Sequence, residues 1–412
     1  MREMKDSGIE WIGAIPANWD IMPNKYLMWK KKRICPIYNG EDIISLSMNG
    51  VIVRDLDAGG KMPSSFDGYQ YIESGNLLMC LFDIDVTPRC IGLIKCNGLT
   101  SPAYSQFVLT DLADAAYYNY YYTMLDNDKT LVHLAKNLRH SITEEQLGTI
   151  STIVPPKTEQ KVIADFLDDK IEEINNITSD LQVEIETLEE YKRSVITEAV
   201  TKGLDPDVEM RDSGVQWIGM MPTHWDCQRG KYILRYVQKP VRDDDGVITC
   251  FRDGEVTLRS NRREEGFTMA DKEIGYQGID VGDLVVHGMD GFAGAIGISD
   301  SRGKASPVLN VLDTEQNKRY IMYYLRSMAY NDVFVALATG IRVRSCDLRW
   351  NKLAELLYPM PPVEEQQVIV EHIDSVLERT NAIIADKKQQ IETIEEYKKS
   401  LIFEYVTGKK EV

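Results

Sequence analysis

The sequence has few of the residues and motifs on which catalysis or metal binding usually depends. It contains seven cysteines and five histidines among 412 residues, and no two cysteines form a CxxC pair. This scatter argues against a disulfide framework or a zinc site and fits a reducing cytosol. No GxxxxGK[ST], HExxH or GxSxG motif is present, which argues against P-loop, zincin and hydrolase sites. We therefore expect a chain that is not an enzyme by itself and that holds no cofactor or metal.

Two stretches come close to cofactor motifs and depart from them at decisive residues. The glycine-rich "GFAGAIG" from Gly291 lacks the GxGxxG spacing that opens a helix, so it predicts a turn between strands. The segments "VPPK" and "MPPV" lack both the amide and the aromatic residue with which amino-methyltransferases hold their target amino group. Neither stretch predicts a methyltransferase or a dinucleotide site.

Long apolar runs are also absent. No stretch of 18 or more apolar residues occurs, so no membrane span is predicted. The segment from Met1 to Gly8 is charged and lacks an apolar core, so we expect no signal peptide. Hydrophobic residues make up 43% of the chain and charged residues 27%, as in ordinary globular proteins. The expected location is the cytoplasm.

Net positive charge is missing as well, since the formal net charge is −17. Residues 157–202 hold 12 acids and 6 bases, and residues 363–412 hold 11 acids and 7 bases. These two segments therefore carry −10 of the −17, and the rest of the chain is nearer to balance. Bulk charge thus neither supports nor excludes a nucleic-acid partner.

What the chain does contain is a repeat. "DSGIEWIGAIPANWD" at residues 6–20 returns as "DSGVQWIGMMPTHWD" at residues 212–226, an offset of 206. At the same offset, "PPKTEQKVI" returns as "PPVEEQQVI", and "IETLEEYKRSVI" returns as "IETIEEYKKSLI". The chain is thus a tandem duplication of a unit of about 200 residues, with a short head, a variable block and a closing segment.

The closing segments are predicted to be long helices. Pro155–Pro156 and Pro361–Pro362 end the preceding structure and permit a helix to start, with Glu159 and Glu365 in the first turns. A helix of about 40 residues spans roughly 60 Å.

Apolar residues in both closing segments follow a heptad pattern. They are Leu167, Ile171, Ile174, Leu181, Ile185, Leu188 and Val195 in the first copy, and Ile373, Leu377, Ile384, Ile391, Ile394 and Leu401 in the second. Thr380 and Lys387 interrupt the second series. Two amphipathic helices on separate cores are one interpretation. Their length and heptads favour pairing with each other, antiparallel if a pseudo-two-fold axis relates the copies.

The variable blocks read as α+β. Short strands bounded by Gly and Asn turns are predicted within residues 42–55, 76–84 and 90–98, and within 246–260, 283–291 and 293–303. Tyrosine-rich helices follow at 115–125 and 318–328, and we expect their rings to be core aromatics. The head tryptophans are likewise predicted to be packing anchors: Trp11, Trp19, Trp217 and Trp225. The scaffold repeats while the surface residues differ, which suggests two related but different ligands.

The paired heads, "PPxxEQxxI" helix starts and "EEYKxSxI" helix ends together resemble the specificity subunit of type I restriction–modification systems over essentially the whole chain. The resemblance implies two α/β target-recognition domains, 1–154 and 204–360, separated by two conserved helices, 155–203 and 361–412, that form an antiparallel coiled coil. The run "GIRVRS" of the second block is typical of such domains. The first block has "NLRHS" instead and lacks the Gly-x-Arg-x-Arg form.

The resemblance also implies a function and partners. The chain would be a non-catalytic reader of double-stranded DNA that recognises a split, asymmetric site and directs adenine-N6 methylation and restriction in phage defence. Two modification subunits would supply S-adenosylmethionine, and two restriction subunits would supply the ATP- and Mg-dependent activity. The remaining alternatives are a fused restriction–methylation protein that retains activity and a coiled-coil interaction scaffold without DNA specificity.

Base edges are read mainly by Arg, Asn and Gln side chains. The candidate DNA contacts are therefore Arg259, Asn261, Arg262, Arg263, Arg342 and Arg344 in the second block, and Arg54, Lys61, Asn137, Arg139 and His140 in the first. A solvated charged loop is the alternative, which Glu264 and Glu265 support. The basic run at residues 30–33 is open to both interpretations, as a phosphate contact or a solvated face. We expect Arg342→Ala to weaken specific binding by roughly 1–3 kcal/mol in a gel shift.

Overall fold

The computed structural model describes residues 2–48, 50–58, 63–135, 140–262, 274–337 and 348–412. Its contacts divide the chain into two compact units: unit 1 comprises residues 1–181 and 388–412, and unit 2 comprises residues 182–387. The chain has mixed helix and strand content, as the sequence predicted. The predicted domain boundaries stay a prediction, because the two units divide the chain inside the long helices and not at their ends.

Unit 1 contains short strands in antiparallel pairs and one four-stranded sheet of order β4-β11-β8-β9. Its strands are β1 (Met4–Asp6), β2 (Ala14–Pro16), β3 (Asp20–Pro23), β4 (Met28–Lys31), β5 (Ile44–Ser47), β6 (Gly50–Val53), β7 (Gln70–Ile72), β8 (Leu77–Met79), β9 (Ile91–Leu93), β10 (Gly98–Thr100), β11 (Ser105–Leu109) and β12 (Ser151–Val154). Its short helices are η1 (Asn24–Tyr26), α1 (Ala115–Asn127), α2 (Thr130–Leu134) and α3 (Glu144–Thr149). The two-stranded pairs are β1–β2, β3–β12, β5–β6 and β7–β10.

Unit 2 repeats this pattern pair by pair, with a four-stranded sheet of order β16-β23-β20-β21. Its strands are β13 (Met210–Asp212), β14 (Met220–Pro222), β15 (Asp226–Arg229), β16 (Arg235–Val237), β17 (Ile248–Cys250), β18 (Val256–Leu258), β19 (Gln277–Ile279), β20 (Leu284–His287), β21 (Ile296–Ile298), β22 (Gly303–Ala305), β23 (Leu309–Asp313) and β24 (Leu357–Met360). Its short helices are α5 (Gly230–Ile233), η2 (Arg259–Asn261), η3 (Gly291–Ala293), α6 (Lys318–Tyr330), α7 (Val333–Ala336) and α8 (Trp350–Leu353). The pairs β13–β14, β15–β24, β17–β18 and β19–β22 match those of unit 1 one for one. The sequence repeat is therefore a repeat of topology.

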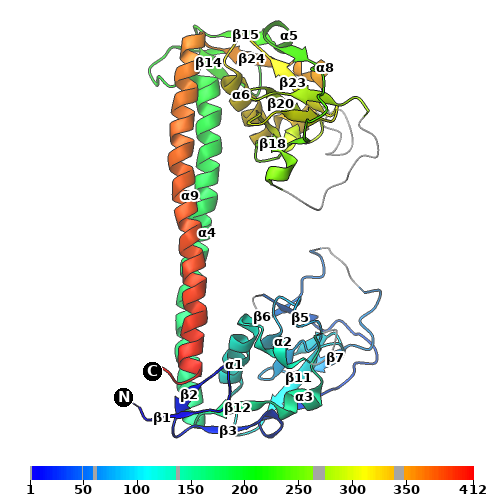
Figure 1. Ribbon diagram of the computed structural model, residues 1–412, viewed down its shortest axis with the longest axis vertical. Helices are drawn as coiled ribbons and strands as arrows, with labels where there is room; N and C mark the ends of the chain where they lie inside the picture. Colours follow the sequence, from blue (N-terminus) through cyan, green and yellow to red (C-terminus); the bar gives the residue numbers. More distant parts are fainter. Residues whose placement is uncertain (1, 49, 59–62, 136–139, 263–273, 338–347) are drawn as a thin grey trace. The chain divides into compact units, whose positions relative to one another are not determined.

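The central strands are buried on both faces, and alternate residues enter different cores. In β20, Leu284 and Val286 belong to one apolar cluster and Val285 belongs to another. In β8, Leu77 and Leu78 divide in the same way. Helix α1 packs against the sheet of unit 1, and α6 against the sheet of unit 2 (Figure 1). Each sheet thus supports a helix on one face and a strand pair on the other.

The tyrosine-rich helices lie in the core, in agreement with the sequence analysis. Asp114 and Asn317 cap them by accepting two backbone N–H bonds each. Tyr120 donates its hydroxyl to Asp168, 2.6 Å away, and Tyr323 donates to Asp374, 2.5 Å away. Buried hydroxyls need such partners, and these two fix each helix against the start of a long helix.

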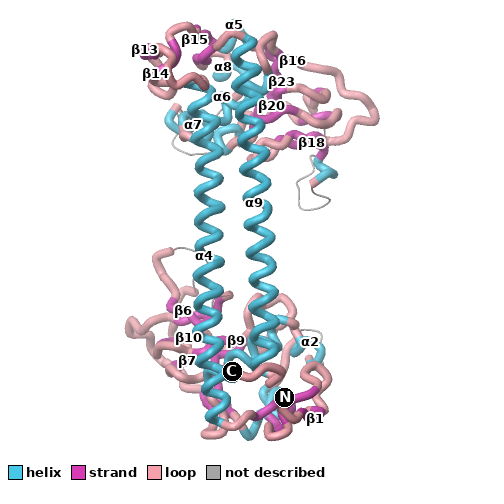
Figure 2. The backbone as a smooth tube through the Cα atoms, turned by 90° about the vertical axis from the view of Figure 1, so that its left-hand side faces the viewer, coloured by secondary structure: helices cyan, strands magenta, loops and turns pink. Residues whose placement is uncertain are grey.

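The long helices are α4 (Lys157–Lys202) and α9 (Val363–Val406), and each begins directly after its proline pair, as predicted. In each unit a stretch of α4 lies beside a stretch of α9 (Figure 2). In unit 1, Lys398 donates to Asn175 over 2.7 Å, and the rings of Phe166 and Tyr405 are 4.5 Å apart. Residue numbers rise along one helix as they fall along the other, so the helices are antiparallel there.

In unit 2 the same direction holds. Lys387 forms an ion pair with Glu184, and a Cβ added at Gly203 would lie 3.6 Å from Glu365 Oε1. Both interruptions of the heptad pattern are accommodated here. Lys387 pairs with a carboxylate, and the buried Thr380 donates its hydroxyl to the carbonyl of Val376, 2.8 Å away within the same helix.

The repeated head binds the repeated helix start. Trp19 donates its indole N–H to Glu159 Oε2, and Trp225 donates to Glu365 Oε1, each over 3.0 Å. Both indoles are fully buried, so these two tryptophans are packing anchors as predicted. Burial opposes ionisation of Glu159, but hydrogen bonds from Arg2 and Trp19 outweigh it and lower its pKa. Trp11 and Trp217 are only partly buried and pack against the edges of the two cores.

Each unit is completed by the end of the long helix that begins in the other unit. Tyr117 in unit 1 donates to the carbonyl of Val406, at the end of α9, over 2.7 Å. Tyr320 in unit 2 donates to the carbonyl of Val200, at the end of α4, over 3.0 Å. Each unit therefore consists of one head, one block, the start of its own long helix and the end of the other.

Candidate nucleic-acid interface

The candidate residues of unit 2 are held at the end of the β17–β18 hairpin. The N–H of Arg259 donates to the carbonyl of Val247 over 2.8 Å, which closes the hairpin at its open end. The guanidinium Nε of Arg259 lies 3.3 Å from Thr249 Oγ1, and the amide of Asn261 donates to Thr257 Oγ1 over 2.8 Å. Strand threonines thus orient both side chains, and the structure brings these two candidates together in η2.

Arg262 belongs to the same turn but is engaged by acidic side chains. Its Nη1 lies 2.7 Å from Asp253 Oδ2 and 2.9 Å from Glu255 Oε2. Its guanidinium also lies 4.1 Å from the ring centroid of Phe251. The stacking fixes the plane of the guanidinium, while the carboxylates offset its charge. A DNA contact by Arg262 would have to displace these carboxylates.

The acids around Arg262 are not the ones that the sequence suggested. Glu264 and Glu265 lie outside the described residues, whereas Asp253 and Glu255 come from the turn of the hairpin. Nearby, Arg252 is exposed and donates to Asp290 Oδ1 over 2.8 Å. Arg252 was not among the candidates predicted from the sequence, although its position in the turn between two predicted strands could have identified it as a loop candidate.

Unit 1 holds Arg54 at the position equivalent to Arg259. The N–H of Arg54 donates to the carbonyl of Ile43 over 2.7 Å, the same closing bond at the open end of the β5–β6 hairpin. Arg54 and Arg259 therefore occupy equivalent places in the two units. Both side chains are partly buried.

His140 lies elsewhere in unit 1, after α2. Its Nε2 is 3.9 Å from Asp85 Oδ2, and its backbone carbonyl accepts from the N–H of Ile84 over 3.2 Å. The residue has a φ of +42°, in the left-handed region that non-glycine residues rarely adopt. These contacts fix the segment around residue 84 and give His140 a structural role in the described chain.

Six candidates lie outside the described residues, so the structure places none of them. They are Lys61, Asn137 and Arg139 in the first block and Arg263, Arg342 and Arg344 in the second. Their proposed DNA contacts stay predictions from the sequence.

The basic run at residues 30–33 is largely engaged within unit 1. Lys30 pairs with Glu144, and Lys31 Nζ lies 2.6 Å from Glu73 Oε2. Arg33 stacks over Tyr71, 4.7 Å from the ring centroid. Three side chains of the run thus have partners within unit 1. A phosphate contact by the run stays a prediction.

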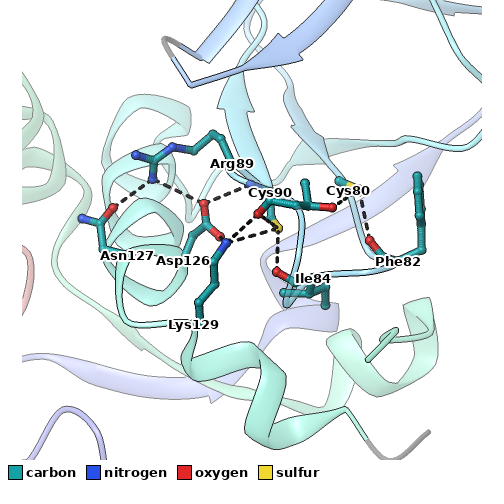
Figure 3. Close-up of polar contacts among 9 residues, drawn as sticks. Cys80, Phe82, Ile84, Arg89, Cys90, Asp126, Asn127 and Lys129 are labelled. Atoms are coloured by element: carbon teal, nitrogen blue, oxygen red, sulfur yellow. Dashed lines mark hydrogen bonds and ion pairs between the residues drawn. The ribbon is translucent and has the colours of Figure 1, made fainter. Parts of the chain in front are cut away.

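Unit 1 also contains a buried polar cluster that was not predicted from the sequence (Figure 3). Asp126, which is almost fully buried, accepts from the N–H of Cys90 over 2.9 Å and from Lys129 Nζ over 2.8 Å. Arg89 Nη1 approaches the same carboxylate at 3.3 Å. Burial raises the pKa of the Cys90 thiol to about 12, so the thiol stays protonated at neutral pH. The cluster therefore offers no thiolate nucleophile and acts as a polar tie between α1, β9 and α2.

Within the described part of the chain, no group of three or more His, Cys, Asp or Glu side chains is arranged to hold a metal ion. No helix in the described ranges combines the length and apolar character needed to cross a membrane.

Comparisons with known proteins agree with the repeat architecture. The chain matches one solved in a study of complex assembly and conformational transition of the type I R-M system, with a TM-score of 0.66 at 13% identity. The match covers 96% of this chain and 99% of that chain, and at this identity it establishes the fold. No curated protein sequence matches.

Two further solved structures were found. The HsdS subunit from Thermoanaerobacter tengcongensis gives a TM-score of 0.48 at 12% identity over 96% of this chain and 98% of its own. The S subunit of the type I system from M. genitalium gives 0.36 at 12% identity over 94% and 96%. Residues 91–187 match the family model described as the type I restriction modification DNA specificity domain. The resemblance that the repeated motifs carry, to the specificity subunit of type I restriction–modification systems, is thereby confirmed.

Proposed function

We propose that this chain reads a split, asymmetric site on double-stranded DNA through two target-recognition domains, one in each unit. The observation that carries the proposal is the duplicated topology with unlike hairpin surfaces. Two copies of one framework with different side chains around Arg54 and Arg259 would read two different sequences. The DNA site would therefore have unlike halves, because both readers belong to one chain and do not have to be identical.

The long helices would set the gap between the half-sites by pairing as an antiparallel coiled coil. Helix α4 has 46 residues and is therefore roughly 69 Å long. Half-sites on one face of a duplex recur about every 34 Å. A helix pair of this length is sufficient to separate two readers by one or two turns of DNA.

The chemistry would come from partner subunits and not from this chain. Two modification subunits would bind S-adenosylmethionine and methylate adenine at N6, and two restriction subunits would use ATP and Mg to translocate and cleave. The similarity to a chain from a type I R-M assembly supports these partners. A methylation assay on the chain alone tests the division of labour, and turnover without a second subunit would contradict it.

Methylome sequencing of cells that express the chain with a type I modification subunit tests the reader directly. We expect a new N6-methyladenine motif with two unlike halves and a fixed gap. A co-purifying complex that produces no new motif would argue against the proposal.

Two observations favour a second function, a coiled-coil scaffold without DNA specificity. The long helices are acidic, and Asp253 and Glu255 offset the charge of Arg262. The two functions differ in salt dependence, because phosphate contacts make DNA binding fall steeply as salt rises. If the assembled complex bound duplex DNA equally well at low and high salt, the scaffold function would be favoured.

A further inference from the structure

Two arginines from different helices of unit 2 meet at one tyrosine. The guanidinium of Arg326 on α6 lies 5.6 Å from the ring centroid of Tyr330, and that of Arg193 on α4 lies 5.7 Å from the same centroid. Arg326 Nε also donates to the Tyr330 hydroxyl over 2.8 Å. Asn331 donates to Thr197 Oγ1 over 3.1 Å, which joins the end of α6 to α4 close by (Figure 1). Arg193, Arg326 and Tyr330 are called the arginine–tyrosine cluster below.

The arginine–tyrosine cluster carries positive charge that no ion pair offsets. Among the residues that the structure describes, neither Arg193 nor Arg326 pairs with a carboxylate. Arg252 and Arg262 of the neighbouring hairpin, by contrast, both do. Arg193 is exposed, and the other two members are partly buried. Two unpaired guanidiniums at a protein surface attract anions, and their planar N–H groups match the oxygens of a phosphate.

Arg326 also connects the cluster to the candidate nucleic-acid interface. Its Nη2 donates over 2.7 Å to the carbonyl of Asp253, in the turn of the β17–β18 hairpin. Gly254 follows in that turn with a φ of +92°, and a Cβ added there would overlap the Arg326 guanidinium. The turn can come this close because residue 254 is glycine. Arg326 is therefore held between the hairpin that leads to Arg259 and the long helix that carries Arg193.

Unit 1 does not repeat the arginine–tyrosine cluster. Helices α1 and α6 have equal lengths, and the two positions of α6 are occupied by Thr123 and Asn127 in α1. The position of α4 is occupied by Lys399 in α9, and Lys399 pairs with Glu396 over 2.6 Å. The repeated framework therefore forms without the cluster. Its three side chains are not required by the fold and are available to a ligand.

We propose that the arginine–tyrosine cluster binds a backbone phosphate of DNA. The phosphate would accept N–H groups of Arg193 and Arg326, while Tyr330 keeps the two guanidiniums beside each other. Since Arg326 also holds the carbonyl of Asp253, a phosphate bound here would fix the hairpin relative to the neighbouring bases. Phosphate contacts position a protein on the duplex without reading its sequence. The proposal rests on the proposed function and adds a positioning site to the candidate base readers.

The salt dependence of DNA binding tests the proposal. The full chain in complex with a type I modification subunit is titrated, at several salt concentrations, with a random duplex and with the duplex identified by methylome sequencing. Arg193→Ala should lower the slope of log affinity against log salt by about 1 and weaken binding to both duplexes alike. Arg193→Lys should keep the slope, because it keeps the charge. Arg326→Ala should lower the slope by about 1 and also reduce the preference for the identified duplex, because the hairpin loses its contact.

The matched control is Arg379→Ala, which removes an exposed arginine of α9 that has no carboxylate partner in the described ranges and should leave the slope unchanged. Circular dichroism melts check that each variant stays folded. An unchanged slope for Arg193→Ala, or an equal loss for Arg379→Ala, would overturn the phosphate site. The proposed function would stand in either case, provided that the unaltered complex prefers the identified duplex. If the unaltered complex showed no such preference, the proposed function itself would fail.

Discussion

The hairpin β5–β6 of unit 1 and the hairpin β17–β18 of unit 2 occupy the same place in the fold and present different surfaces. The first exposes apolar side chains, Met48, Ile52 and Val53. The second presents charge at its turn, with Arg252 and Asp253 exposed. Thymine methyl groups accept apolar contacts, while guanine edges accept arginine. The contrast therefore supports half-sites of different sequence.

The interiors differ too, beneath an identical arrangement of strands. Unit 1 has Asp126 on α1 bound to Cys90 beside β9, whereas the corresponding positions of α6 and β21 in unit 2 are the buried Ala329 and Ala295. The same helix is thus attached to the same sheet by a polar tie in one copy and by apolar packing in the other. The topology tolerates either solution because the strand pairings and the head–helix bonds are independent of it.

The largest effect is expected where the units agree. Trp19→Ala and Trp225→Ala should each cost about 3–5 kcal/mol of unfolding free energy, because a buried indole is lost and a glutamate loses one of its hydrogen-bond partners. Hydrogen exchange of the amides of α1 and α6 reports each unit separately. Equal losses in the unit that carries the substitution are expected, and unequal losses would break the equivalence of the two frameworks.

The next effect should be confined to unit 1. Asp126→Ala should destabilise unit 1 by about 2–3 kcal/mol, because Arg89 and Lys129 stay charged after their carboxylate partner is removed. Urea denaturation followed by exchange at α1 measures the loss. The double variant Asp126→Ala with Lys129→Ala should recover part of the stability. An equal loss at α6 would contradict the assignment of the cluster to unit 1 alone.

The hairpin comparison is sharpened by matched arginine substitutions. Arg54→Ala and Arg259→Ala should each weaken specific DNA binding by about 1–3 kcal/mol and relax one base in a different half of the site. Gel shifts with duplexes altered in one half measure this, and Arg379→Ala on α9 is the control. Loss of recognition in the same half for both variants would refute the equivalence of the two positions.

The smallest expected effect is a pH dependence of stability that arises from His287 in unit 2. Its counterpart in unit 1 is Cys80. Burial lowers the pKa of His287, and its Nδ1 accepts the N–H groups of Met289 and Asp290 at 3.2 and 2.9 Å. The unfolded chain therefore binds a proton at this histidine more readily than the folded chain does. The contribution of His287 to stability is fully present above the ordinary histidine pKa and declines as pH falls below it. A His287→Asn variant should lose this decline in melts between pH 5 and 8. An unchanged decline would assign the pH dependence to other groups.

The repeat, the helices and the aromatic anchors could all be predicted from the sequence. Proline pairs fixed the starts of α4 and α9, and alternation with Gly and Asn turns located the strands of both blocks. These signals are local, because capping, backbone restriction and side-chain periodicity act within a few residues. The candidate site was predicted less completely, since Arg252 and the acids at residues 253 and 255 gain their roles from a hairpin turn that brings them to Arg262.

By itself, the sequence determined that one unit occurs twice, that each copy ends in a long amphipathic helix and that Trp19 and Trp225 are anchors. Only the tertiary structure decided which ends meet: Val406 closes unit 1 and Val200 closes unit 2. These contacts join residues 289 and 120 positions apart, and no local pattern specifies such a partner. They form because an antiparallel helix pair brings the end of each helix to the start of the other, where a buried tyrosine hydroxyl must find an acceptor.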